Sequence, residues 1–306
     1  MLADSMVTHT SITANGSVVT NFEHAEKLIC LGKALPAAAM FNGQATLLDE
    51  FVTIILKQAG HEAEKNGAST AKDVVDTVKQ HIDTVYRSKI PDLKKLYAAQ
   101  WSEPETLAKV NNDRKNKGLA PANKVEPNRV ALIGDPTNST DPKDYDVVFE
   151  YSLTVVVAAW FGNDPTAVEI MWPGAKENDI LKTFGKNLVF WGTGGIPVGR
   201  LLMGYDFSRL RDAALTDPQA QIAHQYFQKE QLSYSMPVPM SAMPLQDAIN
   251  FAEFMGETAA GYDRFRAGPP TVGGELDILV LSADSREWVD HKEFHSKRRQ
   301  VSRSGR

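Results

Sequence analysis

The sequence begins Met1-Leu-Ala-Asp4-Ser5-Met6 and, after a polar run that contains Asn15-Gly16, continues Glu26-Lys27-Leu-Ile-Cys-Leu-Gly32. Residues 2–7 are typical of a buried strand that ends in a polar loop, and residues 26–31 pass from charged to apolar as a partly buried strand does. The Asn-Gly pair between them is a hairpin signal. Alanine-rich residues 35–41 predict a further strand directly afterwards. The chain therefore opens with several short strands.

Composition narrows the classes of protein. With 306 residues and 42% hydrophobic content the chain can bury a sizeable core. A net charge of -5 argues against a nucleic-acid partner. The sequence contains no apolar run long enough for a membrane helix and no legible signal peptide. Cys30 is the single cysteine, which suggests a reducing compartment. We therefore expect a cytoplasmic protein with neither a nucleic-acid nor a membrane partner.

Helical spacing of apolar residues predicts several amphipathic helices. One begins near Thr46, a second covers residues 70–86, and a third lies near residues 103–116. Two more follow Asp217-Pro218 and cover Leu245 to Phe265. Residues 91–145, rich in Asn, Lys, Pro and Asp, are interpreted as an elaboration between core elements because they contain few apolar residues.

The strongest strand signal is at residues 146–160, which are rich in β-branched and aromatic side chains. Shorter strands are predicted at 167–172, 187–191, 276–282 and 288–290. The glycine-rich run 192–199 lacks the residues of a phosphate loop and is interpreted as a strand-end loop. We expect one domain over residues 1–290 and a basic, disordered tail over residues 291–306.

The order of these features resembles the proteasome-type N-terminal-nucleophile (Ntn) hydrolases. The shared features are Asp-Ser, a strand with Lys, Asn42-Gly43, a helix, central strands, a helix pair, and Thr271-Val-Gly273-Gly274 before an apolar strand. The resemblance implies an α+β fold, a four-layer αββα sandwich of two antiparallel sheets flanked by helices. The strand that carries the nucleophile in this family normally precedes the Asp, and the sequence has no residues for it, so the first strand is apparently missing.

The resemblance also implies a site. Asp4 takes the place of the acid that orients a lysine, and Lys27 takes the place of the amine that lowers the pKa of the nucleophile. The amides around Asn42 and Gly43 would bind the oxyanion, and Gly273-Gly274 would form a wall of the pocket. The substrate would be a peptide or another amide, and neither a cofactor nor a metal is implied. The resemblance also implies that the chain associates with itself or joins a proteasome-like assembly, as members of this family do.

Two functions remain open at this stage. The chain is an amide or peptide hydrolase if a Thr, Ser or Cys nucleophile precedes Met1, because Met1 itself cannot attack an amide. Alternatively, it is a catalytically inactive proteasome-like subunit or scaffold. Asp4 and Lys27 favour the enzyme, although an Asp–Lys pair also occurs on ordinary protein surfaces.

Other chemistry-bearing residues give weaker signals. Cys30 lies on an apolar strand, where a lone cysteine is usually inert, and Ser5 has no free amine beside it. His81 lies within an apolar helical face, which favours a partly buried, hydrogen-bonded core histidine over a metal ligand. His61-Glu62 begins like a zinc-protease helix, but Lys65 stands where the second histidine is needed.

Overall fold

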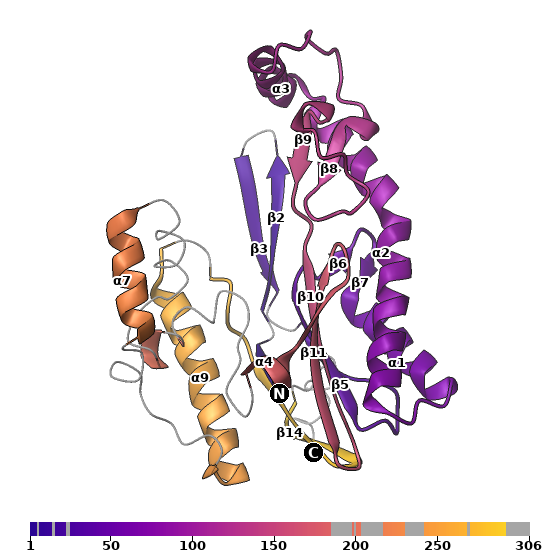
Figure 1. The fold of residues 1–306 in the computed structure, drawn as a ribbon, viewed down its shortest axis with the longest axis vertical. Helices are drawn as coiled ribbons and strands as arrows, with labels where there is room; N and C mark the ends of the chain where they lie inside the picture. Colours follow the sequence, from indigo (N-terminus) through magenta and orange to yellow (C-terminus); the bar gives the residue numbers. More distant parts are fainter. Residues whose placement is uncertain are drawn as a thin grey trace, which may run out of the picture. The chain divides into compact units, whose positions relative to one another are not determined.

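The computed structural model describes residues 1–4, 6–13, 16–22, 25–184, 198, 200–202, 217–229, 242–267 and 270–291 (Figure 1). This part of the chain is α+β, with helices and several antiparallel sheets, as the sequence predicts at that coarse level. The residue contacts divide the chain into two compact units. Unit 1 comprises Met1–Lys27, Lys186–Val280 and Glu287–Arg306, and unit 2 comprises Leu28–Gly185 and Leu281–Arg286.

Unit 2 is built on a five-stranded antiparallel sheet in the order β12-β11-β10-β5-β4. Its strands are β4 (Leu28–Cys30), β5 (Ala37–Gly43), β10 (Leu153–Phe161), β11 (Asp164–Trp172) and β12 (Lys176–Asp179). The central strand β10 pairs with both neighbours, so that Val157 lies opposite Ala39 on one side and Val168 on the other. Its apolar composition follows from this position, since most of its side chains are buried.

Helices α1 (Val52–Lys65) and α2 (Ala71–Trp101) pack on this sheet. Helix α3 (Pro104–Asn116) comes after α2 in the sequence, and the short helix α4 (Ile180–Phe184) comes after β12. Helix α2 begins with a capping box, in which Thr70 and Asp73 exchange side-chain and backbone hydrogen bonds. It extends well beyond the predicted end at residue 86. Its later turns, together with β8 (Val130–Leu132) and β9 (Val147–Phe149), bury apolar side chains in the same core as the sheet.

Two local predictions are wrong in this region. The helix expected from Thr46 begins only at Val52, after a two-stranded hairpin of β6 (Thr46–Leu47) and β7 (Glu50–Phe51). The strand expected at 146–160 is divided into β9 and β10 by residues 150–152. The two segments are joined to each other, because the Tyr151 hydroxyl bonds to the Thr46 carbonyl and to the Leu48 amide.

Asp146 joins the segments on either side of β8. Its carboxylate accepts bonds from Arg114 at 2.8 Å and from Arg129 at 2.8 and 3.0 Å, and its side chain is 1% exposed. Burial alone raises the pKa of Asp146, but the hydrogen bonds from Arg129 and Arg114 outweigh burial and hold that pKa below its ordinary value.

Arg286, the second residue of strand β14 (Ser285–Asp290), binds the segment between β4 and β5 within unit 2. Its guanidinium donates to four backbone carbonyls of residues 31–37 at 2.7–3.2 Å. The Glu64 carboxylate accepts from the backbone N–H groups of Lys33 and Ala34 in the same segment. The segment is therefore held through its carbonyls and its amides at once.

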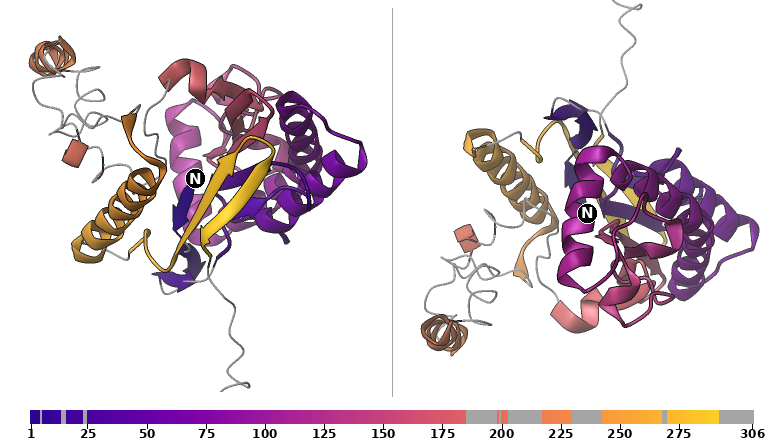
Figure 2. Two further views of the ribbon diagram at one scale, coloured as in Figure 1. Left: turned by 90° about the horizontal axis from the view of Figure 1, so that it is seen from below. Right: turned by 90° about the horizontal axis from the view of Figure 1, so that it is seen from above.

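Unit 1 contains most of a three-stranded sheet in the order β1-β13-β14. Strand β1 (Leu2–Asp4) pairs antiparallel with β13 (Leu276–Ser282), and β14 (Ser285–Asp290) forms a hairpin with β13, seen as two yellow arrows in Figure 2. A second hairpin joins β2 (Val7–Thr13) to β3 (Gly16–Phe22), at the place where Asn15-Gly16 signals one. The chain passes between the units within β13 and again within β14.

Helices α7 (Pro218–Lys229) and α9 (Leu245–Phe265) also belong to unit 1. The bounds of α9 are those that the sequence predicts, and Asp217 accepts from the Gln219 amide as an N-cap does. Helix α9 packs on β1 and β13 through Gly256, which lies against Leu2 and Leu276. No helix in the described ranges is both long and apolar enough to span a membrane.

Several predictions lie outside the described residues. They concern Ser5, the strand at 187–191, the loop at 192–199 apart from Val198, and the tail beyond His291.

Replacing Asp146 with Asn tests the pairing with Arg114 and Arg129. At pH 7 we expect the free energy of unfolding in urea to fall by about 3 kcal/mol, because two guanidinium groups lose their partner. Since the folded-state pKa is depressed, Asp146 contributes fully above the unfolded-state pKa of about 4 and progressively less as the pH falls below it. The difference between wild type and variant should therefore shrink at pH 3.

Asp113→Asn is the matched control. Asp113 on α3 pairs with Lys117, the residue after that helix, and its side chain is 51% exposed, so the change in the free energy of unfolding should stay below about 0.5 kcal/mol. An equal loss for both variants, or a difference that grows toward pH 3, would contradict this account of Asp146.

Candidate functional site

The predicted partners Asp4 and Lys27 form an ion pair within unit 1. Lys27 Nζ lies 2.9 Å from Asp4 Oδ1, and the two side chains are 17% and 20% exposed. Asp4 is the last residue of β1, where pairing with Leu276 of β13 fixes its backbone. Lys27 precedes β4. The pair is mostly withdrawn from solvent, so it is screened less than an exposed surface pair.

The second carboxylate oxygen of Asp4 binds a third segment. Asp4 Oδ2 accepts from the backbone N–H of Gly273 at 3.1 Å and from that of Met6 at 3.3 Å. The Met6 amide also donates to the Gly273 carbonyl at 3.0 Å. Every one of these groups donates to the carboxylate, as an ionised carboxylate requires, because it can only accept. Asp4 thus joins segments near residues 4, 27 and 273.

The structure brings together three of the six predicted site residues, namely Asp4, Lys27 and Gly273. Gly274 follows Gly273, also with a positive φ, but in the described residues the bond to Asp4 comes from Gly273. Asn42 and Gly43 belong to unit 2, where they end β5 opposite Thr154 and Leu153. Their predicted role in binding an oxyanion stays a prediction.

Gly43 has a structural reason to be glycine. Its φ is +95°, and a Cβ atom there would lie 2.5 Å from the Ser152 carbonyl oxygen. A side chain could therefore not be accommodated without moving the backbone at Ser152, just before β10. This close approach explains the residue without any catalytic role.

Asp263 is a site-supporting residue that sequence reasoning missed. It is 4% exposed, and its Oδ2 accepts from the backbone amides of Thr271 and Val272, the latter at 2.8 Å, while Oδ1 lies 3.0 Å from Arg266 Nε. Burial raises the pKa of Asp263, but the two amides and Arg266 more than offset it and lower that pKa. Asp263 therefore fixes the two residues that precede Gly273.

A signal for Asp263 was present in the helical pattern. The face of α9 that carries Ala252, Met255 and Ala259 continues, four residues on, to Asp263. A carboxylate at the end of an otherwise apolar face needs donors, and the loop Pro270–Gly274 is the next segment along the chain.

Other candidates are accounted for differently. His81 Nδ1 lies 2.8 Å from Glu62 Oε2, so it is a partly buried, hydrogen-bonded histidine, as predicted, with a partner on α1 that its own helix does not reveal. Within the described part of the chain no group of three or more His, Cys, Asp or Glu could hold a metal ion. Cys30 ends β4 in unit 2.

The sequence matches no protein-family model, and it matches no curated protein. The resemblance to proteasome-type hydrolases therefore stays a prediction.

Replacing Asp263 with Asn tests whether this carboxylate holds the segment that reaches Asp4. We expect faster hydrogen exchange at the amides of Thr271, Val272 and Gly273, because Asn keeps a single, weaker acceptor. The free energy of unfolding should fall by about 1–3 kcal/mol. Hydrogen exchange followed by NMR measures the first effect and urea unfolding the second.

Glu257→Gln supplies the control, since Glu257 is exposed on the same helix. It should leave exchange at residues 271–273 unchanged and alter stability by less than about 0.5 kcal/mol. Unchanged exchange in the Asp263 variant would show that another contact holds the segment.

Proposed function

We propose that this chain is a homologue of the proteasome-type Ntn hydrolases that cleaves a peptide or amide bond through an N-terminal nucleophile preceding β1. The observation that carries the proposal is the shielded ion pair of Asp4 and Lys27, closed by the amide of Gly273. These residues are far apart in sequence, and the resemblance names each of them for this site.

The fold that goes with this proposal is the four-layer αββα sandwich. Its support is that helices pack on the largest antiparallel sheet of each unit: α9 packs on β1 in unit 1, and α1 and α2 pack on the five-stranded sheet in unit 2. Strand β1 is an outer strand of its sheet in the described part of the chain. A strand preceding Leu2 would find an open edge there.

The proposed chemistry assigns a role to each residue. Asp4 orients Lys27. The Lys27 ammonium has three N–H groups and donates one of them to Asp4. The charge of that ammonium stabilises the developing anion of a nearby hydroxyl or thiol nucleophile. The proton of the nucleophile passes to its own α-amine while backbone N–H groups stabilise the oxyanion. The α-ammonium then gives a proton to the leaving amine as the amide C–N bond breaks, and water hydrolyses the acyl-enzyme. No metal or cofactor is needed for this sequence of steps.

The alternative is an inactive proteasome-like subunit or scaffold. A specific observation favours it: both carboxylate oxygens of Asp4 are engaged with the chain, so the cluster has a purely structural use in joining three segments of unit 1. In that case self-association or a proteasome-like assembly would be the function.

The N-terminus of the protein purified from its native source separates the two functions. Mass spectrometry should find a Thr, Ser or Cys as the first residue, in a segment ahead of Leu2. Such a protein should hydrolyse fluorogenic peptide amides, and Lys27→Met or Asp4→Asn should each lower kcat by at least about 10²-fold. Lys33→Met, at an exposed lysine, should leave kcat unchanged.

A first residue that carries no nucleophile, together with absence of hydrolysis by the wild type, would reject the enzyme. The scaffold then predicts that Asp4→Asn and Lys27→Met lower stability and assembly while Lys33→Met does not.

A further inference from the structure

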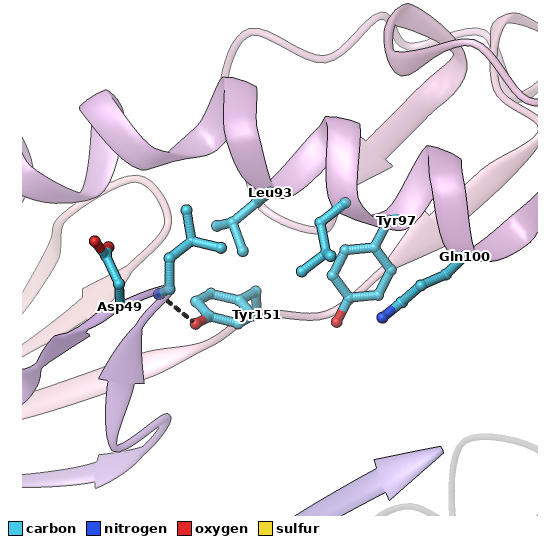
Figure 3. A pocket seen from close by; sticks show the side chains of 7 residues that line it. Asp49, Leu93, Tyr97, Gln100 and Tyr151 are labelled. Carbon is cyan, nitrogen blue, oxygen red and sulfur yellow. Dashed lines mark hydrogen bonds between the residues drawn. The ribbon is translucent and has the colours of Figure 1, made fainter. Parts of the chain in front are cut away.

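The turn between β6 and β7 and one face of α2 line a cavity of about 400 Å³ in unit 2 that is open to solvent on one side (Figure 3). Cavities of about 300–1,000 Å³ are the usual size for small-molecule sites. Its walls come from Leu48 and Asp49 in the turn, from α2, and from Tyr151 ahead of β10. Asp4, Lys27 and Gly273, which together form the Asp4 cluster, are not among the residues that line this cavity.

The walls of this cavity are fixed by hydrogen bonds. The Tyr151 hydroxyl donates to the Thr46 carbonyl at 2.7 Å and accepts from the Leu48 amide at 3.1 Å, a bond drawn in Figure 3. The buried Tyr86 hydroxyl donates to the Tyr151 carbonyl. Because its hydroxyl is already satisfied, Tyr151 presents an apolar ring face to the cavity rather than a free polar group. A ligand therefore finds a preformed surface.

The centre of the cavity is apolar. Leu93 and Leu96 both line it, and Leu93 is buried whereas Leu96 is 46% exposed. Together with the Tyr151 ring they form a surface suited to a flat ring, since an aromatic ring gains from contact with both aliphatic and aromatic side chains. The exposed part of Leu96 is apolar area that a ligand would remove from water.

Two neutral polar groups stand at one end. Tyr97 and Gln100 are three residues apart on α2, and in Figure 3 the Tyr97 hydroxyl and the Gln100 carboxamide point the same way. In the described residues neither side chain has a hydrogen-bond partner within the protein. The Tyr97 ring is fixed by stacking on Phe149, with centroids 3.8 Å apart. Burial raises the pKa of Tyr97, so its hydroxyl stays protonated and can donate.

The opposite end of the cavity carries the charged side chain of Asp49, which is paired with Lys89. Asp49 lies 2.8 Å from Lys89, and the hydrogen bond from Lys89 lowers the pKa of Asp49. Lys89 also lies 4.0 Å from Glu50. A cationic ligand would compete with Lys89 for these carboxylates, and an anionic ligand would meet their charge. The cavity therefore favours an uncharged ligand.

We propose that this cavity binds a small, uncharged ligand with one ring and a carboxamide-like group. The ring lies on Leu93, Leu96 and Tyr151. The polar group exchanges hydrogen bonds with the Tyr97 hydroxyl and the Gln100 carboxamide, which together offer both donors and acceptors. This inference does not depend on the proposed hydrolase, because none of its residues belongs to the Asp4 cluster.

The test uses three probes that share a ring and differ in charge: benzamide, benzoate and benzylammonium. Each is titrated into the full chain and followed by saturation-transfer NMR and by amide chemical shifts. We expect benzamide to saturate, to shift amides of residues 93–100 and 48–49, and to bind several-fold more tightly than either ion. A charged probe loses hydration free energy on entering the cavity, and the described residues that line it offer no unpaired opposite charge to offset that loss.

Variants locate the binding. Leu96→Trp fills the cavity and should abolish saturation by benzamide. Tyr97→Phe keeps the stack on Phe149 but removes the hydroxyl, so it should weaken benzamide by about three- to tenfold, the value of one neutral hydrogen bond. Leu181→Trp adds the same bulk at another exposed leucine, on α4, and should leave binding unchanged.

Three outcomes would overturn the proposal. They are the absence of saturable benzamide binding, binding that survives Leu96→Trp, and tighter binding of either ion than of benzamide.

Discussion

A carboxylate that leaves water must find donors inside the protein, and this requirement determines where the segments of unit 1 meet. Asp4 satisfies it with the Lys27 ammonium on one oxygen and the amides of Gly273 and Met6 on the other. Separating the three segments would break the ion pair and both amide hydrogen bonds of Asp4 together, so these contacts favour the folded arrangement jointly. The same contacts that would orient a catalytic lysine also hold the fold together, so stability and site geometry are coupled here.

Asp146 and Asp263 solve the same problem with different donors. Asp146 uses two guanidinium groups, which suits a junction between side chains of separate elements, whereas Asp263 uses backbone amides, which suits a loop whose path must be fixed. The second arrangement matters for the site. Asp263 holds Val272 next to Gly273, Gly273 bonds to Asp4, and Asp4 bonds to Lys27. Asp263 on α9 is thus connected to Lys27 through two hydrogen bonds, the peptide link between Val272 and Gly273, and one ion pair.

Sequence patterns predicted the elements whose stability is local. The periodicity of α9 and the apolar run of β13 gave bounds that the structure confirms, and the capping pair Asp217-Pro218 located the start of α7. The patterns failed where a distant residue decides the conformation. Glu62 on α1 bonds to His81 on α2, a contact between two different helices. Asp263 binds amides of the loop after α9, whose path the helical periodicity does not predict. The pairing of Asp4 with Lys27 was available only through the resemblance, since their spacing alone indicates nothing.

Tyr151 shows what such a distant contact can build. Its hydroxyl holds Leu48 at a φ of +57°, a conformation that costs a residue with a side chain about 1–2 kcal/mol. The bonds to Thr46 and Leu48 offset that cost and delay the start of α1, which is why the helical pattern from Thr46 misleads. Tyr151 therefore both holds the turn that misleads local prediction and forms a wall of the hollow beside α2.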